Sequence, residues 1–256
     1  MKACKVLRSL TVSPPQEVRE IHTRLLRLGM AVDDSRAYWR KYQPGQARKE
    51  ATDQAFEERW FGAKSYKRVE YLIFSLGTRF EGFIDRLKAW DPEEKQDRCW
   101  VCHFHLQFTD PLYRLFSDGY LSRRLERSQP SVENLSALEW LEGLEPGRWA
   151  AATAERLVSG LSSCLTEAGF CEGRKSPRAV SIPPLSDASL GYLLYFLRDT
   201  EFEGRLLTNP YISATRLGPD LNLRLKKLPG IEFQSRGDVS TIGWKHETFQ
   251  DWLAAL

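Results

Sequence analysis

The sequence of 256 residues lacks the long apolar segments that mark a membrane protein. No apolar run approaches the roughly 20 residues that a helix needs to span a bilayer, so we expect no membrane association. The N-terminus, MKACKVLRSLTVSPP, begins with basic residues but has no sustained apolar core, and we expect no signal peptide. Both absences favour a cytoplasmic protein.

Motifs that support catalysis or cofactor binding are also missing. The sequence contains no G-x-S-x-G elbow, no P-loop, no G-x-G-x-x-G and no paired-Asp nuclease motif. Adjacent acidic pairs such as Glu57 and Glu58 lie in polar helical stretches and are typical of solvated helix faces. We therefore expect no catalytic residue, no cofactor and no enzymatic activity.

Cysteine is scarce, and its spacing fits neither a disulfide framework nor a complete metal site. Cys99 and Cys102, followed by His103 and His105, could begin a zinc site or a haem attachment site. The sequence has no second pair of ligands at such spacing, and haem attachment requires export. We expect free thiols in a reducing compartment and no bound metal. The five cysteines are Cys4, Cys99, Cys102, Cys164 and Cys171.

What the chain does contain is typical of a folded protein with two basic regions. Its hydrophobic content is 42% and its aromatic content 12%, which excludes an extended disordered chain. The net charge is only +3, but residues 1–50 carry eleven Lys and Arg against five Asp and Glu. Residues 205–245 carry seven against three. Two basic regions around an acidic centre suit a polyanionic partner, although solvated helix faces would give a similar pattern.

Helical periodicity dominates the sequence. A helix is expected from Pro14 to Leu28, and Ser65 is expected to cap a strongly amphipathic helix. We predict a mainly α fold with small β-hairpins, in which helical bundle halves carry winged helix-turn-helix-like units. The expected domains are an N-terminal helical domain with a basic helix (1–90), a helical domain ending in a wing-like hairpin (91–185), and a C-terminal winged-helix-like unit (186–256).

The segment from Leu217 to Trp244 is the most informative part of the sequence. The amphipathic basic run LNLRLKKL is followed by two β-prone runs, IEFQ and VSTIGW, which flank a tight turn. A helix followed by a hairpin is typical of a winged helix-turn-helix, which binds DNA without catalytic residues. A second hairpin is expected around residues 174–178.

Three groups of residues could contact nucleic acid. They lie at the start of the helix capped by Ser65, at the tip of the first predicted hairpin, and on the C-terminal helix and hairpin. We expect the three groups to converge on one surface that contacts phosphates rather than bases. The alternative is that each is the solvated face of a protein-interaction module. The residues are Lys64, Ser65, Lys67 and Arg68; Arg174, Lys175 and Arg178; and Arg224, Lys226, Lys227 and Arg236.

Two stretches resemble the BrxA family, accessory proteins of the BREX phage-exclusion systems of bacteria. One is AKSYKRVEYLIFSLGTRFEGF, and the other runs from DPLYRLFSDGYLSRRL to TAERLVSGLSSCLTEAGFCEG and the hairpin after it. The resemblance implies a mostly helical protein that binds double-stranded DNA beside a methyltransferase and an ATPase. On this resemblance, the matching basic helix is that of Lys64, Ser65, Lys67 and Arg68.

These observations lead to one expected function and two alternatives. We expect a non-enzymatic, double-stranded DNA-binding accessory protein of a bacterial anti-phage defence system. The alternatives are a protein-protein interaction scaffold within a defence complex and a winged-helix transcriptional regulator.

Overall fold

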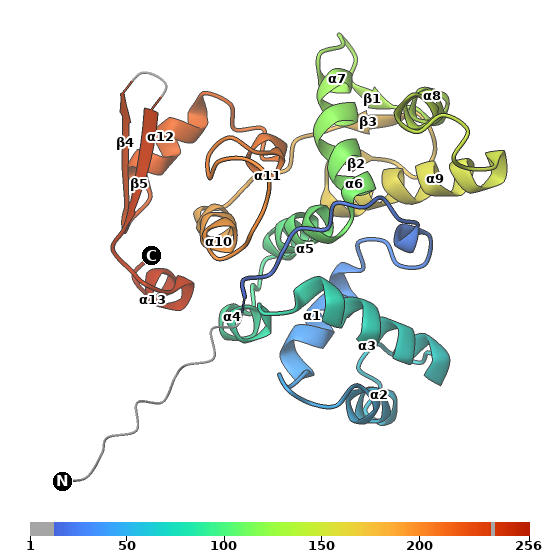
Figure 1. Ribbon diagram of the computed structural model, residues 1–256, viewed down its shortest axis with the longest axis horizontal. Coiled ribbons are helices and arrows are strands. Elements are labelled where there is room, and N and C mark those ends of the chain that lie inside the picture. Colours follow the sequence, from blue (N-terminus) through green and yellow to red (C-terminus); the bar gives the residue numbers. More distant parts are fainter. Residues whose placement is uncertain (1–12, 237–238) are drawn as a thin grey trace.

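The computed structural model describes residues 13–236 and 239–256 and is mainly helical with two small antiparallel sheets (Figure 1). This is the predicted fold class. In chain order the elements are η1 (Arg24–Leu26), α1 (Val32–Lys41), α2 (Arg48–Glu57), α3 (Tyr66–Phe80), α4 (Ile84–Trp90), α5 (Lys95–Thr109), α6 (Pro111–Leu115), the π-helical turn η2 (Phe116–Tyr120), α7 (Leu121–Leu125), β1 (Ser131–Val132), α8 (Asn134–Leu144), α9 (Ala151–Ala168), β2 (Cys171–Glu172), β3 (Arg178–Val180), α10 (Asp187–Arg198), α11 (Pro210–Ala214), α12 (Asp220–Lys227), β4 (Ile231–Arg236), β5 (Val239–Trp244) and α13 (Phe249–Ala254).

Helix α3 shows how closely local sequence determines the helices. Ser65 is its N-cap, and the Ser65 hydroxyl accepts a hydrogen bond from the backbone N–H of Arg68 at 3.4 Å. The apolar side chains that recur every three or four residues are buried as predicted, from Val69 to Phe80. Cap and periodicity agree, so this helix forms where the sequence predicts it.

The N-terminal segment departs from the prediction. Residues 14–28 were expected to be helical, but the chain runs extended to the short 3-10 turn η1 (Figure 1, blue). Its backbone bonds to distant segments instead: Glu17 N donates to Glu201 O at 2.9 Å, and Val18 N donates to Phe108 O at 3.0 Å. Glu201 N in turn donates to Pro15 O at 2.9 Å. These long-range bonds satisfy the groups that a helix would have paired locally.

Residues 111–180 form the first winged unit. Helices α6, η2 and α7 are followed by β1, then by α8 and α9, then by the hairpin of β2 and β3. Strand β3 lies in the middle of the sheet, because it pairs with β2 on one side and with β1 on the other. Helix, strand, two helices and a hairpin is the element order of a winged helix-turn-helix.

Residues 187–244 form the second winged unit, in which α10, α11 and α12 precede the β4–β5 hairpin. The final helix, α13, packs on α10 through Trp252, whose indole N–H donates to Pro229 O at 2.6 Å. Gly191 on α10 makes this contact possible, because a Cβ there would lie 2.2 Å from the Trp252 ring. The predicted order of helix and hairpin in this region is confirmed.

Helix α5 is the centre of the molecule. Every residue from Cys99 to Phe108 is buried, so this helix is covered on all sides. It packs against α1, α3, α6, α9 and α10. The boundaries expected near residues 91 and 186 fall in the loops before α5 and α10, and one hydrophobic core continues across both. Within the described ranges, no helix is long and apolar enough to cross a membrane.

Candidate nucleic-acid interface

The first predicted group lies at the start of α3, and only part of it presents its charge to solvent. Lys64 Nζ pairs with Asp34 Oδ1 at 2.9 Å and donates to Phe61 O at 2.7 Å. This ammonium ties the start of α3 to α1 and is already compensated. Lys67 is exposed, and no carboxylate of the described residues lies within 4 Å of it.

Arg68, on the same turn as Lys67, is held against the N-terminal segment. Its Nη1 donates to Arg27 O at 3.0 Å, and its guanidinium lies 5.7 Å from the centre of the Tyr71 ring. These contacts leave part of the guanidinium at the surface, since Arg68 is half-buried. The start of α3 therefore presents Lys67 and Arg68, with Ser65 acting as the helix cap.

In the second group, the prediction that Arg178 lies at a hairpin tip is wrong. Arg178 is in strand β3 and is 8% exposed. Its Nη1 donates to Thr166 Oγ1 at 2.9 Å, and its Nη2 donates to Arg174 O at 3.3 Å. Arg178 thus links strand β3 of the hairpin to helix α9. Arg174 and Lys175 are in the loop between β2 and β3, and both are exposed.

In the third group, Arg224 is also engaged inside the fold, contrary to its expected exposure. Its Nη1 donates to Leu185 O at 2.7 Å, and its Nη2 pairs with the Asp187 carboxylate. Arg224 therefore joins α12 to the start of α10, and its charge is compensated.

The remaining cations of the third group lie at the C-terminal end of α12. Lys226 and Lys227 are exposed, and no carboxylate of the described residues lies within 4 Å of either. Cations in the last turn of a helix also interact favourably with the helix dipole. Arg236 ends β4, where its backbone pairs with Val239, and its side chain lies outside the described part of the structure.

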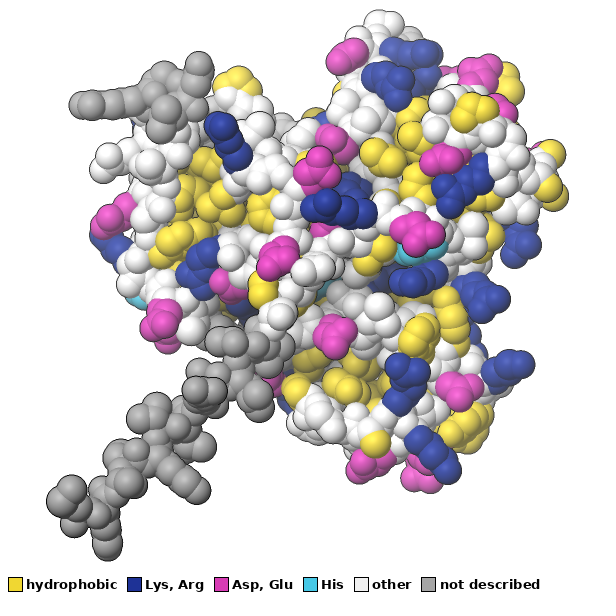
Figure 2. Space-filling view, viewed as in Figure 1, with side chains coloured by type: hydrophobic (Ala, Val, Ile, Leu, Met, Phe, Trp, Pro, Cys, Tyr) yellow, Lys and Arg dark blue, Asp and Glu magenta, His cyan; other side chains and the backbone are white. Residues whose placement is uncertain are grey.

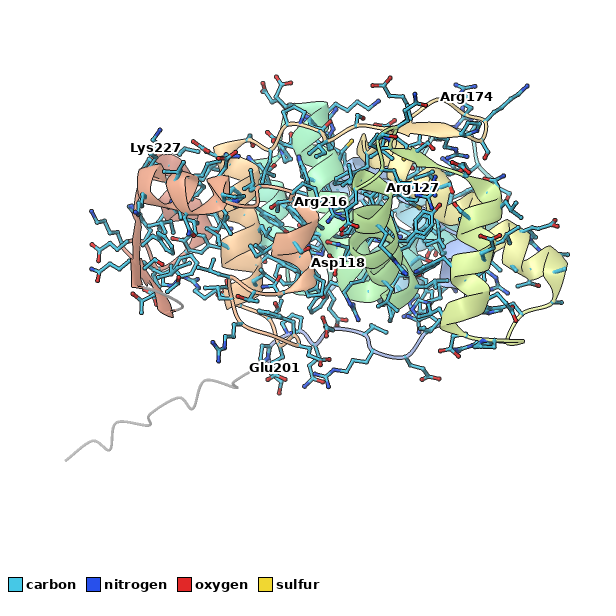
Figure 3. The ribbon with its side chains drawn as sticks, turned by 90° about the horizontal axis from the view of Figure 1, so that it is seen from above. Asp118, Arg127, Arg174, Glu201, Arg216 and Lys227 are labelled. Atoms are coloured by element: carbon cyan, nitrogen blue, oxygen red, sulfur yellow. The ribbon has the colours of Figure 1, made fainter. Side chains whose placement is uncertain are left out.

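The three groups do not converge. Helix α3 is in the lower right of Figure 1, whereas α12 is in the upper left and the β2–β3 hairpin in the upper right. In Figure 3, Arg174 and Lys227 lie along the same upper edge of the molecule but near its opposite ends. The expected single surface is therefore wrong as a compact patch. What the fold keeps is Lys67 and Arg68 at the start of α3 and one exposed cation pair on each winged unit.

The structure adds two exposed cations that no motif singled out, Arg24 and Arg27. Arg24 begins η1 and Arg27 follows it, beside α3, and no carboxylate of the described residues lies within 4 Å of either. The excess of Lys and Arg over residues 1–50 indicated exposed cations in this region, but it did not indicate which residues they are. Figure 2 shows Lys and Arg side chains spread over the right-hand half of the molecule, with Asp and Glu side chains among them.

The cluster of Cys and His around residues 99–105 is part of the core. His105 lies between Arg79 O at 3.0 Å and the Tyr192 hydroxyl at 2.6 Å, and His103 Nδ1 lies 2.8 Å from the Tyr113 hydroxyl. Burial lowers the pKa of both imidazoles from the ordinary 6.5 to about 3, so both are neutral. In residues 13–236 and 239–256, no three His, Cys, Asp or Glu side chains are grouped as metal ligands.

A broad depression lies where the two winged units meet. Its volume is about 880 Å³, and its walls include Leu207 and Leu221 from the second winged unit and Leu125 from the first. Ile182, in the loop that joins the two units, also lines it and is 51% exposed. Exposed apolar side chains in a hollow are typical of a contact surface for another protein.

Together, these features define a mainly helical protein with two winged helix-turn-helix-like units. No protein-family model matches the chain, and no curated protein matches it. Among solved structures, the chain is similar to the crystal structure of an uncharacterized protein from Magnetospirillum magneticum, with a TM-score of 0.53 and 16% identity. The similarity covers 68% of this chain and 92% of that chain. At this identity the similarity concerns the fold alone.

Proposed function

We propose that this protein is a non-enzymatic, double-stranded DNA-binding accessory protein of a bacterial anti-phage defence system. The observation that carries the proposal is the end of α12, where Lys226 and Lys227 are exposed beside the β4–β5 hairpin. In winged helix-turn-helix proteins, this helix and hairpin are the elements that approach a duplex. The defence role, in the cytoplasm beside a methyltransferase and an ATPase, rests on the resemblance to the BrxA family.

The mode of binding that these residues favour is contact with phosphates. Lysine ammonium groups on flexible side chains attract a phosphate as point charges but read no base pattern. The described part of α12 exposes Asn222 and Leu223 but no arginine aimed outward, since Arg224 is bound to Leu185 and Asp187. Binding should therefore be tolerant of DNA sequence and strongly dependent on salt.

The first winged unit also presents cations that can contact phosphates. Arg174 and Lys175 are at the tip of its hairpin, whereas the exposed charged residues of α9 are Glu155, Arg156 and Glu167. The hairpin rather than the helix is thus the part of this unit suited to phosphate. Because Arg174 and Lys227 lie along one edge of the molecule, a long duplex could meet both (Figure 3).

A titration of a fluorescent 30-base-pair duplex over a series of salt concentrations tests the proposal. The wild-type protein should bind two unrelated sequences equally, with an affinity that falls steeply as salt rises. Replacing Lys226 and Lys227 by Gln should weaken binding and lower the slope of log K against log salt by about 2. The thermal melt should not change, because both side chains are exposed.

The matched control is Lys49→Gln with Arg59→Gln. It removes two exposed cations, one from α2 and one from the turn after it, which lie across the molecule from α12 (Figure 1). This variant should keep the wild-type slope. No binding by the wild-type protein at 50 mM salt, a concentration at which contacts to phosphate are strong, would refute the proposal.

The second candidate function is a protein-interaction scaffold. The depression between the winged units favours it, since Ile182 is exposed there and Leu125 and Leu207 are half-buried in its walls. Ile182→Lys separates the two candidates. It should leave binding to the duplex unchanged, but it should abolish assembly with a defence-system protein if the depression is the contact surface.

A further inference from the structure

A separate cavity lies between η1 and the outer face of α3, with a volume of about 290 Å³. Arg24 and Arg27 are on one side, Tyr71 and Phe74 are on the other, and Arg79 contributes to its lining. This size is close to that of the small-molecule sites found in proteins. The cavity is distinct from the surface of α12 and from the depression between the winged units.

The cavity is lined by three arginines, none of which forms an ion pair with a carboxylate of the described residues. Arg79 is only 6% exposed, and its two Nη atoms donate to Met30 O at 2.7 Å and to Gly29 O at 2.8 Å. No carboxylate of the described residues lies within 4 Å of Arg79, Arg24 or Arg27. The Nη atoms of Arg79 bond to backbone carbonyls and to no carboxylate, so an anion in the cavity would add a favourable charge interaction.

Asp110 carries the single carboxylate in the cavity lining, and both of its oxygens have partners within the protein. Asp110 Oδ1 accepts the backbone N–H of Tyr113 at 3.0 Å and so caps α6. Asp110 Oδ2 lies 3.6 Å from His22 Nδ1. Burial raises the pKa of Asp110.

The opposite wall offers aromatic surface. Phe74, on α3, is 42% exposed. The Arg48 guanidinium lies 4.6 Å from the centre of its ring, and the Thr78 hydroxyl donates to Phe74 O at 3.1 Å. An exposed phenyl ring opposite unpaired arginines is the arrangement on which a base stacks while its phosphate is bound.

We propose that the cavity between η1 and α3 binds a nucleoside phosphate, with the phosphate on Arg24 and Arg27 and the base on Phe74. The same chemistry occurs in a free nucleoside monophosphate and in a 5′-phosphorylated nucleotide at the end of a DNA strand. The proposal does not depend on duplex binding by α12, because the two sites share no residue.

Calorimetric titration with dAMP, with 5′-phosphorylated oligo(dA) and with inorganic phosphate tests the proposed nucleoside phosphate site. Arg24→Gln and Arg27→Gln should each weaken binding of the nucleotide about tenfold. Phe74→Ala should weaken it about tenfold as well, because it removes the stacking surface, but should leave the weak binding of inorganic phosphate unchanged. All three side chains are exposed, so the variants should fold normally.

The control is Arg156→Gln with Arg205→Gln, which removes two exposed arginines elsewhere and should change nothing. Binding of dAMP that depends on Arg24, Arg27 and Phe74 supports the site and identifies a free nucleotide as the ligand. Binding of oligo(dA) alone, with the same dependence, supports it and identifies a strand end. Absence of both, or equal binding of inorganic phosphate and dAMP, overturns the proposal. Neither outcome alters the salt slope that tests duplex binding by Lys226 and Lys227.

Discussion

Arg216 of the second winged unit donates a hydrogen bond of 2.6 Å from Nη1 to the Ser122 hydroxyl of the first. Its Nη2 donates to Ser117 O at 2.5 Å, and Ser213 donates to the Asp118 carboxylate at 2.7 Å. Figure 3 shows Arg216 and Asp118 where the two units meet. Arg216 has a φ of 58°, a left-handed conformation that a non-glycine residue adopts only when surrounding contacts hold it. The two units are therefore joined by a polar contact.

Replacing Arg216 by Ala should lower the free energy of unfolding by about 2 kcal/mol. The substitution removes charged hydrogen bonds and leaves the carbonyl of Ser117, a buried residue, without this donor. Urea denaturation measures the change. Arg205→Ala, at an exposed arginine, should stay within about 0.5 kcal/mol of the wild type. Equal stability of the two variants would mean that the contact between the units contributes nothing.

Gly191→Ala should strongly destabilise the C-terminal part of the fold, by about 3 kcal/mol. The added Cβ would lie 2.2 Å from Cη2 of Trp252, and the buried ring has no free space to move into. Gly143→Ala is the matched substitution in another helix, where a Cβ meets no atom within 4 Å. It should raise stability by up to about 1 kcal/mol, because alanine favours helix over glycine. Thermal unfolding of both variants distinguishes packing from helix propensity.

Stability should fall as the pH falls from 6.5 towards 3. The folded-state pKa of His103 and of His105 is about 3, below the ordinary 6.5, so the unfolded chain takes up protons first as the solution is acidified. Each buried histidine should then lower the free energy of unfolding by about 1.4 kcal/mol per pH unit below about pH 6. This stabilisation is fully present above pH 6.5. Urea midpoints at pH 7, 6 and 5 should therefore fall less steeply for His103→Gln than for the wild type, and equal slopes would contradict the assignment.

The four cysteines in the described ranges should not react in the folded protein. Burial raises the pKa of Cys99 to about 11 and those of Cys102, Cys164 and Cys171 to about 12. At pH 8 the reactive thiolate is therefore a fraction of about 0.001 or less. A Cys4→Ser variant, which removes the thiol outside the described residues, should take up no iodoacetamide until urea is added. Rapid labelling under native conditions would show that the core opens readily.

The local sequence determined the helices and the hairpins of this protein. Ser65 as a cap, the apolar repeat from Val69 to Phe80, and Gly169 at a φ of 91° after α9 each act within a few residues. Such signals depend on backbone geometry and on the spacing of apolar side chains, which can be read from the sequence. The same reasoning predicted both hairpins.

Only the tertiary structure decided which cations are exposed and unpaired, and which conformation the N-terminal segment adopts. Arg178 and Arg224 look like surface cations in sequence, yet both are bound inside the fold, Arg224 to residues 39 and 37 positions away. The segment before η1 is extended because its backbone pairs with Phe108 and with Glu201. Partners at such separations are set by how the helices pack, because a charge or a backbone amide pairs with whatever group the fold brings within about 3 Å of it.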